Sequence, residues 1–253
     1  MIVNQSEQFL AELAKQASSV RTPVCARAVM LVEPAEFTIC RESAADNRYM
    51  NLHETADPGR ALQQWRALVA LIADQGIAVV RFSGDPKTPD AVFPNNVFAS
   101  TSKNFIIGHM LHPGRQQEAG REDIRAYFKL QGYATIDLSL RNCIAELTGP
   151  LVIDTTLQIG FCGMTGWVDA AGLEAMNAAF VLKMLFSFTL QPGEYHTNVI
   201  MMVLAGRACV IYPGAFIDLG VPDVIESAFP GRTLVLNEEK KCLCRQLHCI
   251  DAA

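Results

Sequence analysis

The sequence predicts an α/β protein built from one module that is repeated along the chain. Short apolar segments typical of strands alternate with longer segments of helical periodicity. Their order is strand, helix, strand, then strand pair, helix, strand, and again strand pair, helix, strands. A unit of two strands, a helix and a strand therefore recurs at roughly 50–60 residues, slightly beyond the usual solenoid periods. No linker rich in Gly, Ser or Pro interrupts the chain, so we expect one domain over residues 1–253.

Hydrophobic periodicity and turn residues place the individual elements. The segment from Ala61 to Gly76 is the clearest helix, because it is strongly amphipathic and Gly76 ends it. Pro34 ends the first strand, since proline cannot donate to a strand ladder. In chain order we expect helices over 5–19, 61–76, 121–132 and 169–185, strands over 25–34, 77–84, 103–115 and 133–139, a hairpin over 149–163, and two strands within 196–214.

The stretch PDAVFPNNVFAS, residues 89–100, combines signals that conflict. Its apolar residues favour a strand, but Pro94 cannot donate to a ladder. Asn95 and Asn96 are poor strand formers whose amides readily bind neighbouring backbone or a ligand. Two interpretations follow: an edge strand that contains a turn, or a bent strand end that presents two neutral amides to a pocket. The stretch taken alone favours the first.

Composition excludes several classes of partner. The net charge of −5 gives no support to binding of nucleic acid or of a membrane surface. No run of about 18 uninterrupted apolar residues indicates a transmembrane helix. The first residues, MIVNQSEQFLAELAKQ, lack the basic start and apolar centre of a signal peptide. We therefore expect a cytoplasmic protein.

Eight cysteines are then expected to be thiols rather than disulfides. Three of them cluster with His248 in CLCRQLHC, residues 242–249, which invites a zinc interpretation. The spacing is not a common structural-zinc pattern, and the adjacent His248 and Cys249 cannot easily face one ion. We expect no metal site there.

Polar residues stand at four predicted strand ends, where open α/β architectures gather function: Asn95 with Asn96, Arg115, Glu146, and His196 with Asn198. Arg115 follows a turn, so its guanidinium could reach a carboxylate in two-point contact; a solvated surface arginine is the plainer alternative. Glu146 precedes a buried strand, where a carboxylate must be partnered or have a raised pKa. A lone histidine such as His196 is more often structural than catalytic. The case for a site therefore rests on all of them occurring together.

Six segments carry a resemblance to a known family: VMLVEPAEFTICRESAADN, PDAVFPNNVFAS, MLHPGRQQEAGRED, ELTGPLVID, GMTGWVD and YHTNVIMM. In this order and spacing the chain resembles the guanidino-group-modifying, or pentein, superfamily. It is most similar to the citrulline-utilisation hydrolase branch of arginine-deiminase-related proteins. The resemblance covers residues 26–241. It implies an α/β propeller of five ββαβ modules with pseudo-fivefold symmetry around a central active-site channel.

The resemblance also implies roles for the candidate residues. Glu146 corresponds to the carboxylate that grips the reacting group, and His196 to the general acid/base. Arg115 corresponds to a substrate-binding arginine. Asn96 and Asn198 stand where relatives that act on a cationic guanidinium carry acidic residues. Amides both donate and accept, so we expect a neutral ureido group, as in citrulline, to be preferred over arginine; the alternative is that Asn96 merely caps the bend.

The implied reaction is attack of a cysteine thiolate on the amidine or ureido carbon. The histidine protonates the leaving amine and then activates water. No metal or organic cofactor is expected, and the implied partner is a small amino-acid substrate.

Three departures from the family pattern bear on activity, and one is Glu33, where close relatives usually carry arginine. The family's nucleophilic cysteine lies close to the C-terminus, much further from the histidine than Cys249, which is 53 residues beyond His196. Trp167 stands where relatives carry an arginine that helps to hold the substrate carboxylate. Residues 242–253 leave the family pattern, and we expect them to come from a shifted reading frame that leaves the last module incomplete. An incomplete module would expose apolar surface and favour association into homo-oligomers.

Two functions of different class remain open. The first is a hydrolase that acts on the C–N bonds of linear amidines or ureido groups, impaired by the loss of its nucleophile. The second is a catalytically dead pentein module that binds citrulline or arginine analogues or is vestigial.

Overall fold

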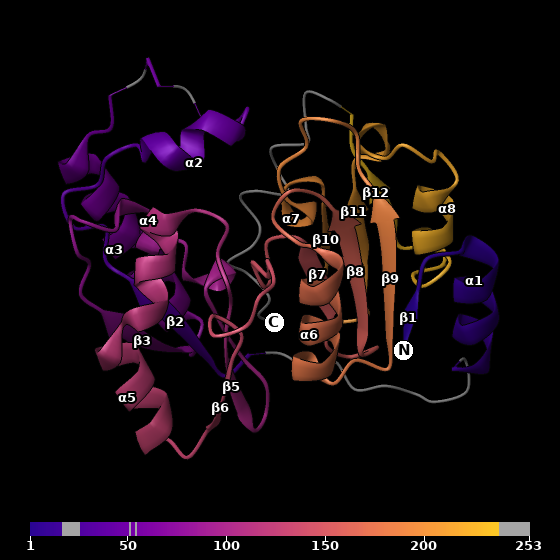
Figure 1. Cartoon of the computed structure of the whole chain (residues 1–253), viewed down its shortest axis with the longest axis horizontal. Coiled ribbons are helices and arrows are strands. Elements are labelled where there is room, and N and C mark those ends of the chain that lie inside the picture. The colour runs from indigo at the N-terminus through magenta and orange to yellow at the C-terminus, as the bar shows by residue number, and fades with distance from the viewer. Residues whose placement is uncertain (17–25, 51, 54, 238–253) are drawn as a thin grey trace. The chain divides into compact units, whose positions relative to one another are not determined.

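A computed structural model describes residues 1–16, 26–50, 52–53 and 55–237 of the chain. These residues form two compact units. Unit 1 holds the described residues within 1–25 and 148–251, and unit 2 holds those within 26–147 (Figure 1). The cysteine-rich tail over 242–253, with its expected frame shift, lies outside the described residues.

Unit 2 contains two small sheets. Strands β2 and β3 pair in parallel, whereas β4 pairs antiparallel with β5 and β5 pairs in parallel with β6. Its elements are β2 (Ala28–Val32), α2 (Arg41–Asp46), α3 (Pro58–Asp74), β3 (Ala78–Phe82), the 3-10 turns η1 (Pro89–Val92) and η2 (Pro94–Asn96), β4 (Phe98–Ser100), β5 (Asn104–Ile107), α4 (Pro113–Gln116), the 3-10 turn η3 (Gln117–Gly120), α5 (Glu122–Leu130) and β6 (Ala134–Asp137).

The helix α3 follows the rules that predicted it. The Asp57 side chain accepts a hydrogen bond from the Arg60 N–H at 3.0 Å, and Pro58 occupies the first turn, where its missing donor costs nothing. Gly76, with φ +76°, follows the helix in the left-handed region. Trp65 and Ile72 are buried on the inner face of the helix. The capping residue, the hydrophobic periodicity and the glycine that ends the helix thus all agree with the observed bounds of α3.

The stretch over 89–100 is an edge strand preceded by turns, which is close to the first of the two interpretations. It forms the consecutive 3-10 turns η1 and η2, and the strand β4 begins only at Phe98. Pro94 takes the first position of η2, and its carbonyl accepts from the Val97 N–H at 3.0 Å. The asparagines and the proline favour a tight turn over a ladder, so local turn chemistry overrides the apolar pattern.

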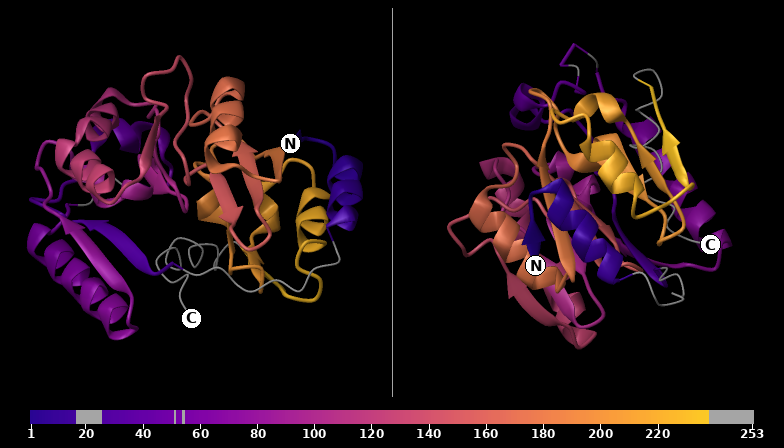
Figure 2. Two further views of the ribbon diagram at one scale, coloured as in Figure 1. Left: turned by 90° about the horizontal axis from the view of Figure 1, so that it is seen from below. Right: turned by 90° about the vertical axis from the view of Figure 1, so that its right-hand side faces the viewer.

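Unit 1 contains a four-stranded sheet in the order β1-β9-β8-β7 and a three-stranded sheet in the order β10-β11-β12. Its elements are β1 (Ile2–Val3), α1 (Ser6–Lys15), β7 (Leu151–Asp154), β8 (Ile159–Met164), α6 (Ala170–Phe180), β9 (Met184–Thr189), α7 (Thr197–Ile200), β10 (Met201–Val203), β11 (Cys209–Ile211), the 3-10 turn η4 (Pro213–Ala215), α8 (Val221–Glu226) and β12 (Thr233–Val235). Helix α6 lies over the larger sheet, and α1 lies beside α8 (Figure 2).

The predicted repeat is confirmed by strand pairing. In each of β4-β5-α5-β6, β7-β8-α6-β9 and β10-β11-α8-β12, the first two strands pair antiparallel and the second pairs in parallel with the third. The first strands begin at Phe98, Leu151 and Met201. The pair β2 and β3, joined through α3, supplies the parallel half of the same motif. One ββαβ module therefore recurs along the chain.

The strand expected over 103–115 ends at Ile107, and residues 113–116 form the helix α4. Two further differences from the sequence prediction fall inside apolar runs. The helix expected over 169–185 ends at Phe180, and β9 starts at Met184, because Val181 adopts a left-handed conformation with φ +55°. Residues 197–200 form the short helix α7 rather than the start of a strand. In both places an apolar run hides a change of backbone conformation, which periodicity alone does not detect.

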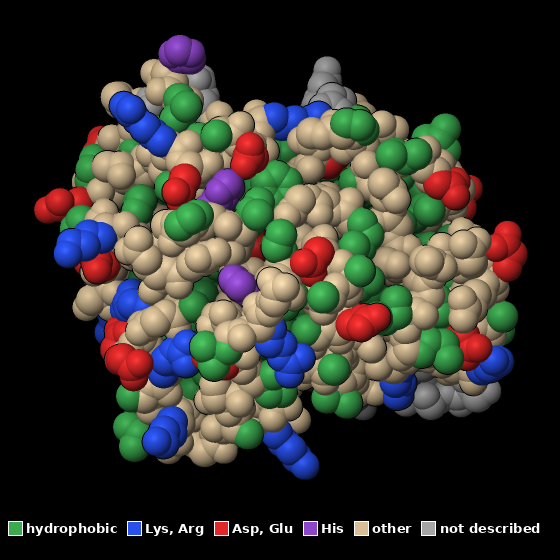
Figure 3. Space-filling view, in the orientation of Figure 1, with side chains coloured by type: hydrophobic (Ala, Val, Ile, Leu, Met, Phe, Trp, Pro, Cys, Tyr) green, Lys and Arg blue, Asp and Glu red, His purple; other side chains and the backbone are tan. Residues whose placement is uncertain are grey.

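The core of unit 1 is rich in phenylalanine. The Phe9 ring lies 4.7 Å from Phe186 and 6.1 Å from Phe161, which in turn lies 6.2 Å from Phe229. Charged side chains of both signs are interspersed on the face of the molecule drawn in Figure 3. None of the described helices combines the length and the apolar character needed to cross a bilayer.

Candidate functional site

Glu146 is a fixed and buried carboxylate in unit 2, with 1% of its surface exposed. Its Oε1 accepts a hydrogen bond from the Leu111 N–H at 3.0 Å, and its Oε2 lies 3.5 Å from Nδ2 of Asn96, which donates to it. The preceding residue, Ala145, pairs with His109 in an isolated antiparallel bridge. Two neutral donors and a backbone bridge therefore hold the carboxylate in one orientation.

The residue that follows Glu146 adopts a costly backbone conformation. Leu147 is fully buried and has φ +25°, in the region that favours glycine. Such a conformation costs on the order of 1–3 kcal/mol and is concentrated at functional sites. The strain coincides with the predicted site residue.

Asn95 and Asn96 both lie in the η2 turn but differ in burial. Asn96 is buried and directs its amide to Glu146, whereas Asn95 is half-buried. The structure thus brings Asn96 and Glu146 together.

Arg115 occupies a different position from the one expected. The sequence predicted either a substrate-binding arginine or a solvated surface arginine, but the residue is only 4% exposed. Its Nε and Nη2 donate to the two carboxylate oxygens of Glu118, both at 3.0 Å. The same Nη2 donates to the carbonyl oxygens of Asp90 and Phe93 at 3.2 and 3.0 Å. Arg115 therefore fastens the bend that carries Asn96, which makes it a positioning residue.

Four charged side chains are buried among the described residues of unit 2: Asp90, Arg115, Glu118 and Glu146. Burial opposes the charge of Arg115, but the charges of Glu118, Glu146 and Asp90 outweigh it and raise the pKa of the guanidinium. Burial raises the pKa of Glu118, and Asp90 and Glu146 add to this while Arg115 opposes it. The hydroxyl of Ser43 donates to the Asp90 carboxylate. We call these four residues the charged cluster.

His196 in unit 1 has an aromatic setting. It is 2% exposed, and its ring lies 3.8 Å from the ring of Tyr195. The Trp167 ring meets the His196 ring edge-on, at 5.6 Å and 84°, and lies 4.3 Å from Tyr195. The loop after β8 and the segment before α7 therefore pack together around the imidazole.

Asn198 fastens the short helix α7 to the start of β7. Its Nδ2 donates to the Thr148 carbonyl at 3.0 Å, and its backbone N–H donates to the Gly149 carbonyl at 3.1 Å. The Thr197 hydroxyl accepts from the Gly163 N–H at 2.8 Å, which ties α7 to β8 as well. These bonds fix the backbone directly after His196.

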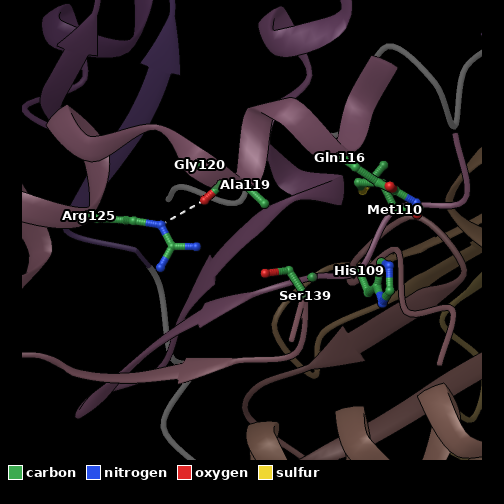
Figure 4. A pocket seen from close by; sticks show the side chains of 8 residues that line it. His109, Met110, Gln116, Ala119, Gly120, Arg125 and Ser139 are labelled. Carbon is green, nitrogen blue, oxygen red and sulfur yellow. Dashed lines mark hydrogen bonds between the residues drawn. The ribbon is translucent and has the colours of Figure 1, made fainter. Parts of the chain in front are cut away.

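Unit 2 also has a cavity of about 200 Å³ that contains none of the predicted residues. Arg125 reaches toward it from α5, Ser139 follows β6, and His109 and Gln116 complete its polar lining (Figure 4). Nε of Arg125 donates to the Ala119 carbonyl at 2.7 Å, and Nη1 donates to Asp137 at 2.8 Å. These groups are engaged in bonds that hold α5 to β6.

The described cysteines differ in access. Cys143, Cys162 and Cys209 are buried, and Cys40 is half-buried. Burial raises the pKa of the Cys162 thiol, which disfavours the thiolate that acts as a nucleophile.

Sequence reasoning missed several residues around the predicted ones. Glu118 stands three residues after Arg115 in RQQE, a spacing that pairs side chains on a helical turn and could have revealed the ion pair. Asp90 lies in the stretch 89–100, and nothing in its spacing marks it. Tyr195 adjoins His196, but a ring contact between neighbours in an irregular segment leaves no periodic signal.

Solved structures support the fold. The N-terminal domain of ArgZ bound to substrate, an arginine dihydrolase from the ornithine-ammonia cycle in cyanobacteria, matches with a TM-score of 0.73 at 20% identity, covering 86% of this chain and 79% of that one. AgrE in a ternary complex with ornithine and NAD⁺ matches with the same TM-score and identity, covering 86% of this chain and 31% of that one. A dimethylarginine dimethylaminohydrolase adduct with 4-chloro-2-hydroxymethylpyridine gives 0.64 at 16% identity, covering 86% and 78%. A search of curated proteins found no match.

The fold is thus that of the guanidino-group-modifying, or pentein, proteins that the sequence motifs resembled. A family model described as N,N dimethylarginine dimethylhydrolase, eukaryotic, matches residues 33–238. Since this match covers most of the sequence, the chain belongs to the N,N dimethylarginine dimethylhydrolase family.

Proposed function

We propose that the chain is a hydrolase, impaired in turnover, that cleaves a C–N bond at the guanidino or ureido carbon of an arginine-like amino acid. Glu146 holds the N–H groups of the reacting end, and His196 moves the protons. The family match supports the reaction class, since the family is described by its action on N,N dimethylarginine. The ArgZ and dimethylaminohydrolase structures, which share the fold, are described as enzymes of arginine and dimethylarginine.

The observation that carries the site is a shared position in the repeat. Glu146 precedes the first residue of β7 by five residues, and His196 precedes the first residue of β10 by the same number. In a cyclic arrangement of modules, equivalent positions face a common axis. Closure of the modules into a five-module propeller, as the family resemblance implies, is therefore part of this proposal.

The chemistry divides between the two residues. A carboxylate accepts hydrogen bonds only, so Glu146 suits the N–H groups of a guanidino or ureido end. In the reaction that the family resemblance implies, a cysteine thiolate attacks the central carbon, and the C–N bond to the leaving amine breaks as the His196 imidazolium donates its proton; none of the described cysteines is assigned the role of that nucleophile. The neutral His196 then takes a proton from water, whose hydroxide attacks the carbon and releases the thiolate.

The amides set the expected preference among substrates. Asn95, Asn96 and Asn198 are neutral, and an amide can serve both the oxygen and the nitrogens of a ureido group. We therefore propose that citrulline-like ligands bind more tightly than arginine. Arg115 contributes by holding the bend that carries Asn96 rather than by contacting the ligand.

A binding module without turnover is the second candidate function. The buried Cys143, Cys162 and Cys209 favour it, because a buried thiol is a poor nucleophile. In that case Glu146 and His196 bind the amino acid, and no covalent intermediate forms.

Incubation with N,N-dimethylarginine, arginine and citrulline tests the proposal, with the released amine and the amino-acid product as readouts. We expect His196→Asn to lower kcat by about 10²–10⁴-fold, the usual contribution of general acid/base catalysis. Glu146→Gln, which keeps the shape but loses the charge, should weaken binding as well as turnover. His53→Asn serves as the matched control because His53 is exposed.

Each outcome separates the two functions. Turnover that both site variants reduce supports the hydrolase. Binding by calorimetry without turnover, lost in Glu146→Gln but not in His53→Asn, supports the binding module. Turnover unaffected by either site variant would overturn the assignment of the site, and absence of both binding and turnover would overturn the function.

A further inference from the structure

The cavity of unit 2 lies at the carboxyl ends of two parallel strands. Gly108 directly follows β5, Ser139 follows β6, and these two strands pair in parallel. In open α/β sheets, ligands bind in the crevice beyond such strand ends. A cavity of about 150 Å³ holds one benzene molecule, so the volume of about 200 Å³ suffices for a small organic molecule.

Two glycines show where the lining is packed and where it is open. A Cβ atom at Gly108 would lie 2.6 Å from the Ala145 carbonyl oxygen and 3.0 Å from that of Asn96, so the backbone is tightly packed at this end of β5. A Cβ atom at Gly120 would meet no atom within 4 Å. The lining at Gly120 therefore leaves open space beside it.

Arg125 presents a donor that the fold does not use. Its Nε and Nη1 are bound to the Ala119 carbonyl and to Asp137, but its Nη2 makes no hydrogen bond to any residue that the structure describes. The guanidinium points toward the cavity (Figure 4). Of the described residues that line the cavity, Arg125 is the one that carries a fixed charge, and Asp137 balances it. A cationic N–H is thus available in a lining without net charge.

His109 and Gln116 each supply an acceptor. Nδ1 of His109 lies 2.8 Å from the Arg141 carbonyl oxygen, which can only accept, so Nδ1 carries the proton and Nε2 of the uncharged ring is an acceptor. Nε2 of Gln116 donates to the Met110 carbonyl at 2.9 Å, which fixes the side-chain amide and leaves its Oε1 as an acceptor.

The Ser139 hydroxyl is a third acceptor. It donates to Asp137 at 2.5 Å and keeps its lone pairs for a ligand. In Figure 4, Arg125 lies at one side of the cavity and His109 and Gln116 lie at the other, with Ser139 between them. The cationic donor and two of the three acceptors are therefore on opposite sides.

This separation selects a zwitterion. A carboxylate suits the Nη2 of Arg125, because a hydrogen bond between two charged groups is about twice as strong as one between neutral groups. An ammonium group has three donors and no acceptor, and the lining offers three acceptors. A simple anion would leave these acceptors unused, and a simple cation would meet the guanidinium. A molecule that carries both charges matches both sides.

We propose that this cavity is a separate ligand site, which binds a small zwitterionic amino acid. The carboxylate lies at Arg125, and the ammonium group lies at His109, Gln116 and Ser139. The inference goes beyond the proposed function and does not depend on it, since the cavity contains none of the residues of the candidate site.

Nuclear magnetic resonance on ¹⁵N-histidine-labelled protein, titrated with L-alanine, tests the site. The chain has five histidines, and His109→Asn identifies the ring signals of His109. We expect these signals to shift saturably, whereas those of the exposed His53 should not.

Three matched probes define the ligand class. Sodium propionate lacks the ammonium group of alanine, ethylammonium chloride lacks its carboxylate, and propionamide is uncharged. Each is titrated against a sodium chloride control. Each should bind about tenfold or more weakly than alanine, because each loses at least one hydrogen bond to a charged group.

A pair of charge variants locates the ammonium group. Gln116→Lys places a cation where the ammonium group of the ligand binds, so the affinity for alanine should fall about tenfold or more while that for propionate does not fall. Gln117→Lys adds the same charge at the next residue, which is also exposed but lies outside the lining, and is the matched control. Ser139→Ala, which removes one acceptor, is the second variant should Gln116→Lys fail to fold.

The outcomes separate this site from the candidate site. Any of the three probes that binds as tightly as alanine would overturn the zwitterion, and no shift with any probe would mean that water alone fills the cavity. Equal losses in Gln116→Lys and Gln117→Lys would overturn the role of the acceptors. Alanine binding that is lost in Glu146→Gln but kept in Gln116→Lys would belong to the candidate site. A saturable shift of His109 in a protein without hydrolase activity would support this site while the proposed function fails.

Discussion

The two units bury their candidate residues in opposite ways. In unit 2, Glu146 belongs to a charged cluster in which Arg115 alone makes four hydrogen bonds. In unit 1, His196 lies among the rings of Tyr195 and Trp167, and the nearby Trp167 N–H has no partner in the described part of the chain. One region is held by electrostatics and the other by ring packing.

This difference predicts different consequences of mutation. Removing one member of a buried charged group leaves the others without compensation, so the loss appears as instability. Exchanging a ring in a packed aromatic group for one of similar shape costs less. Variants in unit 2 should therefore report on folding, and conservative variants around His196 should report on function.

The largest effect is expected for Arg115→Met. The change leaves three buried carboxyl groups without their guanidinium and frees the carbonyls of Asp90 and Phe93, so we expect a loss of about 3–5 kcal/mol in the free energy of unfolding. Urea denaturation at pH 7 measures it. Arg121→Met, which breaks a partly exposed pair with Asp123 and a bond to the Ser83 carbonyl, is the control and should cost less than Arg115→Met.

A second substitution isolates the cause. Combining Arg115→Met with Glu118→Gln removes one uncompensated carboxylate, so the double variant should be more stable than Arg115→Met alone. If the two variants are equally stable, the charged cluster does not hold unit 2 together. The same follows if Arg115→Met loses no more free energy of unfolding than Arg121→Met.

Much of the fold follows from local signals. The helix α3 is marked by its cap, its apolar face and Gly76, and the module repeat follows from the order of elements. The errors fall where an apolar run contains a turn, as at residues 197–200. There the apolar side chains are buried whatever the backbone does, so hydrophobicity carries no information about conformation.

The sequence named candidate residues for the site but not their surroundings. Glu146 and Asn96, which were both singled out through motifs, are joined by a hydrogen bond, and their roles stay a prediction. The burial of Arg115 was missed, since the sequence shows a turn but not the carbonyls that close over it. Contacts between segments distant in sequence depend on tertiary packing, which no local pattern records.

Asn96→Asp sharpens the comparison by adding a charge to the charged cluster. Because Nδ2 of Asn96 lies 3.5 Å from Glu146, a carboxylate there would repel its neighbour, and we expect a loss of about 1–3 kcal/mol at pH 7. Repulsion raises the carboxyl pKa in the folded state above the unfolded value. The loss should therefore be small below about pH 4 and grow as the pH rises through the raised folded pKa.

The same variant addresses specificity. A carboxylate favours a cation, so the ratio of arginine to citrulline affinity should rise. Asn95→Asp adds the same charge one residue away at a half-buried position and should have the smaller effect on both measures. Equal effects of the two variants would show that Asn96 merely caps the bend.

The smallest effect is expected at Asp123, an exposed residue at the start of α5 whose carboxylate pairs with the half-buried Arg121 at 2.6 Å. Hydrogen bonding and charge from Arg121 lower the pKa of Asp123 below its ordinary value of 3.8. A carboxyl group whose pKa is lower in the folded state stabilises the protein at pH values above its unfolded-state pKa. This contribution is lost as the pH falls through the folded-state pKa.

Asp123→Asn should therefore cost less than about 1 kcal/mol at pH 7, because solvent screens the pair, and less still in 1 M salt. Urea titrations at pH values below the lowered pKa of Asp123 should give the same free energy of unfolding for this variant and for the unmodified protein. Glu122→Gln, in the same helical turn but outside the pair, is the control for the helix dipole. A cost at Asp123 comparable to that of Arg115→Met would remove the distinction between buried and exposed charge on which the contrast between the units depends.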